Sequence, residues 1–553
     1  MYSRRTFLKI TAGIIGLFSG GFILRNSNNQ KVKHILASAS HEKLALSVSL
    51  SKKTSRLELV LDDRIVIKGI QTDRIGTNWK FISNKLLSNN SYKLRLMSEG
   101  EGIYKSWNLK TFPSPDAKVE NVSIMSFTCA GGPEGFKISG KEFFKPFRFR
   151  QKVFDEGLSM NPDFAISIGD HIYWDLRGQN APQIGRKNKL IKFFLGSYIG
   201  LVYGSFNRSE KASSSKNEKV LKNIGNEQIA SLYGTRFKST PIFFIPDDHD
   251  YFENDEATDR YVTLPPESYQ KQFFSFVRDH YLPDFLPSAD VPNTLSGTML
   301  NGHNRHFGAL RWGRLSETLM YDCAGFLSLK GETAGLVPPE VERWLCNRST
   351  DKTVEQLMHI PSHPFGWSAG KWREWYPDVA DSGQTGSQTA KMYANGQRFQ
   401  LTTGKPKFMW QKGWWNQHQR LLESISNQQR RPGLVLSGDL HATGHSKIVG
   451  SGDLSFESNP IHSIITGPLG TGSGWPSRAR GTPPMVASHI RLDSPAPVTE
   501  RNGFTLLDIT PDNIRVRLFA WRRESSSLTD IDALDPYHDE NICLLYTSDA
   551  ADE

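Results

Sequence analysis

Between residues 40 and 115, apolar and polar residues alternate in short runs such as Leu44–Val48 and Arg56–Val60. Ser, Asn, Asp and Gly residues that favour turns separate these runs. Alternation with a period of two and regular breaks is typical of antiparallel strands with one buried face. We therefore predict a small β-sandwich domain over residues 40–115, which ends in the linker Thr111–Pro115.

Residues 116–525 show a second pattern, in which short continuous apolar runs alternate with long polar or helical stretches. Runs of this kind are typical of buried strands in an α/β domain. Four of them are followed at once by residue types that bind metals: Val122–Phe127 by Thr128-Cys129, Phe164–Ile168 by Gly169–Tyr173, Ile242–Ile245 by Pro246–Asp250, and Leu434–Leu436 by Ser437–His441. Because ligands bind at the C-terminal ends of strands in open α/β sheets, we predict a metal site at this edge.

Two of these segments place metal-ligand residue types at short spacings. Gly169-Asp170-x-x-Tyr173 offers a carboxylate and a phenol just after a strand, and a bound metal deprotonates a phenol well below its free pKa of about 10. In Gly438-Asp439-x-His441, alternate residues of an extended segment can both reach one ion. The alternatives are an ordinary Gly-Asp turn for the first segment and a capping Asp beside a surface His for the second.

The stretch Asp247–Asp255 holds six acidic or amide residues and one histidine in nine positions. These side chains would repel one another unless a cation or solvent compensates them. A solvated acidic loop is the alternative, but the position directly after a buried strand favours a metal site. Cys129 alone would be a small buried hydrophobe. At the end of a strand and beside Gly131-Gly132, it becomes a candidate thiolate ligand.

The order of these segments resembles the PhoD-like alkaline phosphatase D family of calcineurin-like metallophosphoesterases, over roughly residues 120–520. The resemblance implies an α/β catalytic domain with a four-layer αββα fold, preceded by a fibronectin-like β-sandwich. It implies hydrolysis of phosphate mono- or diesters by a metal-bound hydroxide. It also implies a ferric ion, Fe(3+), and a neighbouring divalent ion, Ca(2+) or another divalent metal. The implied ferric ligands are Cys129, Asp170, Tyr173 and His441, and the implied ligands of the divalent ion are Asp170, Asn254 and Asp439.

Three further residues are candidates for the reaction. We expect His249 to stabilise the transition state or to protonate the leaving group, and Asp248 to be an additional ligand or substrate contact. His363 follows an apolar strand and is either a ligand, a substrate contact or a structural residue. The strand end Leu319–Ala324 lacks the arginine that the family has there, so the resemblance defines no substrate contact at that position.

The N-terminus predicts export. Arg4-Arg5 lies in a twin-arginine block, and the apolar stretch Ile10–Leu24 that follows is shorter than the ~20 residues that span a bilayer. We predict a twin-arginine signal peptide over residues 1–39 with a cleavage site at Ala37-Ser38-Ala39, and hence a periplasmic or secreted protein without a transmembrane span. A membrane anchor or a chance Arg-Arg pair is the alternative.

Composition and charge add little to this picture. Apolar residues make up 38% of the chain and charged residues 22%, which is typical of a globular protein. The net charge of +10 favours anionic partners, but a diffuse excess of Lys and Arg is more often surface chemistry than a binding site. The phosphate-ester substrate therefore rests on the resemblance, and we expect no specific nucleic-acid partner. With four cysteines the chain is no disulfide scaffold, and pairing of Cys323 with Cys346 stays open.

We expect residues 526–553 to form a tail outside the catalytic domain. Its last ten residues, Leu544–Glu553, fit no helix or strand pattern and resemble translated read-through, so we exclude them from the fold. The rival to the enzyme is a catalytically degenerate metallophosphoesterase fold that acts as a cell-surface binding protein. Retention of every ligand type that the family uses favours the enzyme.

Overall fold

The structure is a computed structural model. It describes residues 32–135, 137–138, 141–173, 203–204, 206–207, 209–251, 266, 268–283, 306–327, 335–368, 412–428, 431–472, 484–486, 490–521, 527–532 and 534–543. The twin-arginine block and Asn254 lie outside these residues.

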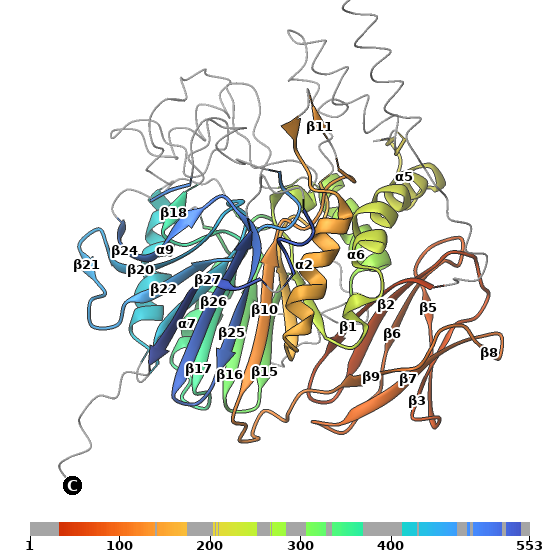
Figure 1. The fold of residues 1–553 in the computed structure, drawn as a ribbon, viewed down its shortest axis with the longest axis horizontal. Helices are drawn as coiled ribbons and strands as arrows, with labels where there is room; N and C mark the ends of the chain where they lie inside the picture. The colour runs from red at the N-terminus through yellow and green to blue at the C-terminus, as the bar shows by residue number, and fades with distance from the viewer. Residues whose placement is uncertain are drawn as a thin grey trace, which may run out of the picture. The chain divides into compact units, whose positions relative to one another are not determined.

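Two antiparallel sheets form the N-terminal part and confirm the predicted β-sandwich (Figure 1). The first has the order β1-β2-β6-β5, with β1 Val32–Ala39, β2 Leu44–Leu50, β6 Asn78–Ile82 and β5 Ile70–Gln71. The second has the order β4-β3-β7-β8, with β9 beside β7: β3 Glu58–Leu61, β4 Ile65–Lys68, β7 Ser91–Ser98, β8 Glu101–Gly102 and β9 Trp107–Lys110. Along β7, Tyr92, Leu94 and Leu96 are buried and alternate with exposed residues, so the period-two pattern marks the core face.

Strand β1 shows that the sandwich begins earlier than predicted. Val32–Ala39 is almost entirely buried and pairs with β2 from Val32 to Ala39. The predicted boundary between residues 39 and 40 therefore differs from the structure, in which these residues belong to the sandwich. The small residues Ala37, Ser38 and Ala39 lie in this buried strand rather than in an accessible cleavage segment.

Two large sheets form the part of the chain that follows the sandwich (Figure 1). The six-stranded sheet has the order β14-β13-β10-β25-β26-β27: β10 Val122–Thr128, β13 Phe164–Ile168, β14 Ile242–Ile245, β25 Asn502–Ile509, β26 Asn513–Trp521 and β27 Pro536–Cys543. The eight-stranded sheet has the order β15-β16-β17-β19-β22-β20-β21, with β24 beside β20: β15 Phe307–Trp312, β16 Ser316–Tyr321, β17 Gln356–Pro361, β19 Gly433–Ser437, β20 Thr443–Ser451, β21 Leu454–Ser455, β22 Ile461–Ile465 and β24 Ile490–Thr499. Strands β10, β13 and β14 are parallel, as are β16, β17, β19 and β22.

Helices cover the outer faces of both sheets. On the six-stranded sheet lie α2 Phe147–Ser159, α5 Ser215–Gly225, the π-helix η1 Asn226–Ser231 and α6 Ser268–Tyr281, and on the eight-stranded sheet lie α7 Pro339–Ser349 and α9 Lys412–Ser426. The described chain also has the short 3-10 helices η2 Arg236–Lys238 and η3 Asp248–Tyr251, and the short strands β11 Lys137–Ile138, β12 Lys141–Glu142, β18 Trp367–Ser368 and β23 Met485–Val486.

The hydrophobic clusters confirm the predicted four-layer αββα arrangement. In β14, Phe243 and Ile245 pack between the two sheets, whereas Ile242 and Phe244 pack against the helices. A third cluster lies between the eight-stranded sheet and helices α7 and α9. Each central strand is thus buried on both faces, which is why the strands read as continuous apolar runs.

The C-terminal boundary differs from the predicted one. Strand β27 pairs antiparallel with β26, so the six-stranded sheet continues beyond residue 525. Of the residues of β27, Ile542 alone is buried. The others are exposed or half-buried, because β27 lies at the edge of its sheet. An edge strand needs few apolar residues, and the sequence therefore gave little sign of it. Leu544–Glu553 lies outside the described residues.

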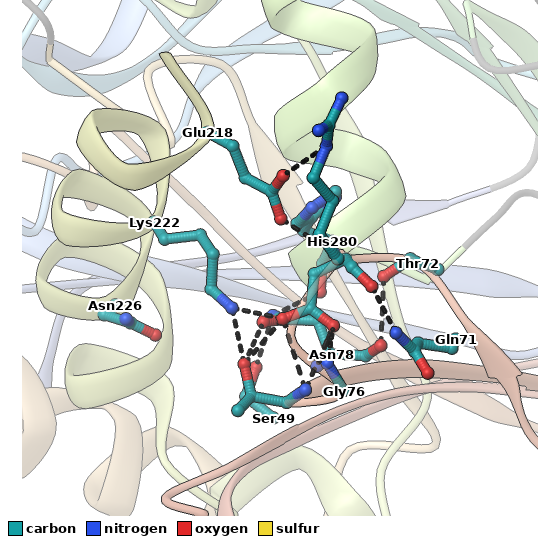
Figure 2. A network of polar contacts seen from close by, with 12 residues as sticks. Ser49, Gln71, Thr72, Gly76, Asn78, Glu218, Lys222, Asn226 and His280 are labelled. Atoms are coloured by element: carbon teal, nitrogen blue, oxygen red, sulfur yellow. Dashed lines mark hydrogen bonds and ion pairs between the residues drawn. The ribbon is translucent and has the colours of Figure 1, made fainter. Parts of the chain in front are cut away.

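Polar and aromatic contacts join the sandwich to the part with the two large sheets. The Phe112 ring lies 4.8 Å from that of Trp312 and 5.4 Å from that of Phe164, between ring centroids. Figure 2 shows a polar network in which the amide of Asn78 donates to the carbonyl oxygen of His280 at 3.0 Å. In the same network, Lys222 of α5 forms an ion pair with Asp73 of the sandwich.

Two further properties follow from the described residues. Cys129, Cys323, Cys346 and Cys543 are all free cysteines, so Cys323 and Cys346 are not paired. A search of these residues finds no helix with the length and apolar character needed to cross a membrane.

Candidate metal centre

The candidate site lies where strands of both large sheets end. Cys129 directly follows β10, and Asp170 and Tyr173 follow β13. Asp248 and His249 form the start of η3, which two residues separate from the end of β14. Asp439 and His441 follow β19, and His363 follows β17 of the same sheet. The predicted position at the C-terminal edge of the parallel strands is thus the position of these side chains in the fold.

Four of the predicted ligands have a left-handed backbone. The φ angles are 49° at Cys129, 55° at Asp170, 63° at Asp439 and 51° at His441. Nine non-glycine residues of the described chain have positive φ, so nearly half of them are predicted ligands. A left-handed residue other than glycine costs roughly 1–2 kcal/mol, and such strain persists only where the surrounding structure holds it. The loops are therefore fixed in shapes that turn these side chains into the site.

The first group of side chains consists of Cys129, Asp170, His441 and Tyr173. One ligand atom each of Cys129, Asp170 and His441 lies within 4.8 Å of the others, and all three residues are buried. The phenol of Tyr173 donates to Asp170 Oδ2 at 2.7 Å and lies 2.9 Å from His441 Nε2. The structure thus brings together the four residues that the sequence predicts for one ion.

The second group shares Asp170 with the first. Asp170, Asp248 and His249 offer ligand atoms within 4.8 Å of one another, as do Asp247, His363 and Asp439. His363 Nδ1 lies 3.2 Å from Asp247 Oδ1. Asp247 belongs to the acidic stretch, but the prediction did not single it out. The structure adds it to the predicted residues Asp248, His249, His363 and Asp439.

The electrostatics of the site suit a bound cation. Burial, followed by the negative charges of Asp248 and Asp439, raises the pKa of Asp170 well above its usual value. Burial also raises the pKa of the Cys129 thiol and of the Tyr173 phenol, and the charge of Asp170 adds to both shifts. Asp170 Oδ1 is buried and has no hydrogen-bond partner within the described chain. A cation would reverse the unfavourable charge interactions and give this oxygen a partner, so the donor set fits a metal.

Comparisons with solved structures show which fold the chain has. A solved structure described as PhoD matches with a TM-score of 0.54 and 14% identity, over 91% of this chain and 88% of that one. The chain therefore has the fold of PhoD. A purple acid phosphatase from seeds of yellow lupin (Lupinus luteus) matches with a TM-score of 0.48 and 12% identity, over 92% of this chain and 73% of that one. No family model matches the chain, and no curated protein sequence does so.

Asp250 fixes two loops of the candidate site relative to each other. Its Oδ1 accepts hydrogen bonds from the backbone N–H groups of His171 at 2.9 Å and Ile172 at 3.3 Å, and its Oδ2 accepts one from Asp247 at 2.9 Å. Burial nevertheless raises the pKa of Asp250 to about 7. Gly169 allows the same two loops to approach, because a Cβ there would lie 2.5 Å from Cβ of Asp247.

Gln228 holds the backbone of Tyr173. Its side-chain oxygen accepts from the N–H of Tyr173 at 2.8 Å, and its amide donates to the carbonyl oxygen of Tyr173 at 2.9 Å. The same oxygen accepts from the N–H of Gly132 at 2.8 Å, in the loop after Cys129. Gln228 is fully buried in the π-helix η1. Helices of this kind are rare in proteins, and those that occur are often at functional sites.

Arg150 of helix α2 holds the loop that follows Cys129. Its Nη1 donates to the carbonyl oxygens of Ala130, Gly131 and Gly132 at 3.1, 2.8 and 2.8 Å. Its Nη2 donates to Pro133 O at 2.9 Å, and its Nε donates to Lys145 O at 2.7 Å. The prediction missed Arg150. An arginine that shares the buried face of a helix with Phe149 and Val153 needs polar partners, and this is the signal that could have identified it.

Asp322 has a structural role at the end of β16, where the sequence defined no substrate contact. Its carboxylate accepts from the phenol of Tyr251 at 2.5 Å and from the N–H of Gly325 at 2.8 Å, and it lies 2.9 Å from His306 Nδ1. These contacts tie the end of β16 to η3. Asn254, the remaining predicted ligand, lies outside the described residues.

Proposed function

We propose that this protein is an exported, metal-dependent phosphoesterase that hydrolyses phosphate mono- or diesters. The observation that carries the proposal is the shared position of Asp170. Its carboxylate belongs both to the group with Cys129 and His441 and to the group with Asp248 and His249. A carboxylate common to two adjacent groups is what a pair of metal ions needs as a bridge.

The ligand chemistry supports one ferric and one divalent ion. A thiolate from Cys129, a phenolate from Tyr173 and the carboxylate of Asp170 bring about three negative charges to one position, more than a divalent ion requires. The second position would have oxygen ligands from Asp170, Asp439 and Asn254, which suit calcium or another hard divalent ion. Bound metal ions of this kind supply an activated water and neutralise the phosphoryl oxygens.

We assign the acid role to His249. Its ring centroid lies 4.3 Å from that of Tyr173, so the imidazole borders the first group of ligands. The backbone N–H of His249 donates to Asp248 Oδ1 at 2.8 Å, which fixes the start of η3. From this position His249 would donate a proton to the leaving oxygen or stabilise charge on the phosphoryl group.

Export by the twin-arginine pathway remains part of the proposal. It rests on Arg4-Arg5 and on the apolar stretch behind them. Since β1 begins at Val32 and is buried, we place the end of the removed segment before Val32 rather than after Ala39.

Tyr173→Phe tests the enzyme and its ions together, with Tyr233→Phe as a control at a second buried tyrosine. Purified, metal-loaded proteins are assayed on aryl phosphate mono- and diesters, and their iron content and visible absorption are recorded. Loss of the phenolate should shift or bleach the ferric charge-transfer band and lower activity by about 100-fold, because it displaces an ion against which the substrate is aligned. Tyr233→Phe should leave both unchanged.

Two outcomes would overturn parts of the proposal. Active, colourless protein with stoichiometric zinc and no iron would remove Cys129 and Tyr173 from the ligand set. Metal-loaded protein without turnover on any aryl phosphate ester would favour the binding protein over the enzyme.

A further inference from the structure

Three side chains from the two large sheets meet at a place outside the candidate metal centre. His445 lies on β20 of the eight-stranded sheet, whereas His538 and Glu540 lie on β27 of the six-stranded sheet. His538 and Glu540 are two residues apart on a strand, so they point to the same face. One ligand atom of each residue lies within 4.8 Å of the others.

The distances among these ligand atoms are those of a metal site. His445 Nδ1 lies 2.9 Å from His538 Nε2, and each of these nitrogens lies 3.4 Å from Glu540 Oε2. In a tetrahedral zinc site with bonds of 2.0–2.1 Å, neighbouring ligand atoms are about 3.3–3.4 Å apart. Two edges of the triangle already match this separation, and the third needs a movement of a few tenths of an ångström.

Other residues orient the histidine and the carboxylate. His445 Nε2 lies 2.9 Å from His462 Nδ1 on β22, and partners of this kind fix the tautomer and ring orientation of metal-binding histidines. Lys447 forms an ion pair with Glu540 Oε1 at 3.0 Å, which leaves Oε2 directed at the two histidines. The ligand atoms are therefore held in place before any ion binds.

The close approach of the two histidines also favours a cation. Because two N–H groups cannot face each other at 2.9 Å, at most one proton lies between His445 Nδ1 and His538 Nε2. At least one of these nitrogens therefore presents a lone pair beside the Glu540 carboxylate, and neutral imidazole is the form that binds metals.

We propose that His445, His538 and Glu540 bind a divalent transition-metal ion of the zinc class. Two imidazoles and one carboxylate are a common ligand set for zinc. The side chains of His538 and Glu540 are 12% and 22% exposed, so water can occupy the fourth position. The ion would fasten β27, at the edge of one sheet, to β20 of the other.

Cobalt binding tests this site in the full-length protein. Protein stripped with a chelator is titrated with Co²⁺, and visible absorption and bound equivalents are recorded for wild type, His538→Asn and Glu540→Gln. Asp539→Asn is the matched control, because Asp539 lies on the same strand but pairs with Arg515. We expect one equivalent fewer in His538→Asn and Glu540→Gln, no loss in Asp539→Asn, and a weakening of about 10- to 100-fold in His462→Gln.

Equal numbers of equivalents and equal affinities in all these proteins would overturn the proposal. If the variants at His538 and Glu540 fail to fold, anomalous diffraction at the zinc edge from wild-type crystals grown with zinc decides, and no peak among the three side chains overturns it. Phosphoesterase activity should be the same in Glu540→Gln and Asp539→Asn. The readout is the bound metal, so it stands even if the protein proves to have no phosphoesterase activity.

Discussion

Replacing Arg150 tests whether the loop after Cys129 is held from helix α2. Arg150→Met keeps the apolar stem but removes the guanidinium, which donates five hydrogen bonds to backbone carbonyl oxygens. Arg150→Lys keeps the charge and replaces the fixed fork of donors with a single ammonium group. Arg148→Met, at an exposed position of the same helix, is the control.

The expected loss of stability follows from these contacts. Hydrogen bonds to charged groups contribute about 1.5–3 kcal/mol each, but one side chain that makes several of them does not give their sum. The guanidinium is fully buried, and burial lowers its pKa to about 10, so its removal also relieves a desolvation cost. We therefore expect Arg150→Met to lower the free energy of unfolding by about 3–5 kcal/mol, Arg150→Lys by less, and Arg148→Met by about 0.5 kcal/mol or less.

Urea denaturation measures these differences, and metal analysis of the same preparations tests the functional consequence. Arg150 donates hydrogen bonds to the carbonyl oxygens of Ala130, Gly131 and Gly132. Its loss should therefore loosen the loop after Cys129 and lower the retention of the ion that we propose Cys129 binds. The reasoning fails if Arg150→Met and Arg148→Met have the same unfolding free energy and the same metal content.

Two further predictions concern the sandwich and export. Asp73→Asn should lower the free energy of unfolding by about 3 kcal/mol at neutral pH, because Lys222 stays buried without its ion pair. Burial raises the pKa of Asp73, but hydrogen bonds from Lys222 and Thr77 outweigh it and lower the pKa overall. The stability that this pair contributes is therefore present above the unfolded pKa of about 3.9 and is lost as the pH falls through the lower folded value, so denaturation of wild type and variant should converge below about pH 3. Replacing Arg4 and Arg5 by Lys should keep the protein in the cytoplasm, and mass spectrometry of exported wild type should find Val32–Ala39 present. Undiminished export of the Lys variant would remove the twin-arginine assignment.

The sequence predicted the central strands well and the edges poorly, for one physical reason. Strand β14 is buried on both faces, so Ile242–Ile245 is apolar throughout and stands out from its polar surroundings. Strand β27 lies at a sheet edge, and its exposed and half-buried positions carry ordinary polar residues. Strand β1 was overlooked because its small residues Ala37 and Ala39 also fit a cleavage site.

The same distinction holds in the candidate site. Cys129, Asp170, Asp439 and His441 were recognisable because metal-ligand residue types directly follow apolar strands. Residues that hold the backbone of these loops have no such pattern. Gln228, for example, lies more than fifty positions along the chain from Tyr173, whose backbone it binds at both ends. Only the fold brings the two together.

The backbone of the loops that carry the proposed ligands would link metal binding to folding. A left-handed conformation at each of Cys129, Asp170, Asp439 and His441 costs roughly 1–2 kcal/mol, and the pKa of buried Asp170 is raised by neighbouring carboxylates. A bound cation would offset both effects, so the folded state of these loops and the bound ions should stabilise each other. Metal would then be acquired together with folding and before export. Twin-arginine export carries folded proteins, and this requirement supports the proposal that Arg4-Arg5 directs the chain to that pathway.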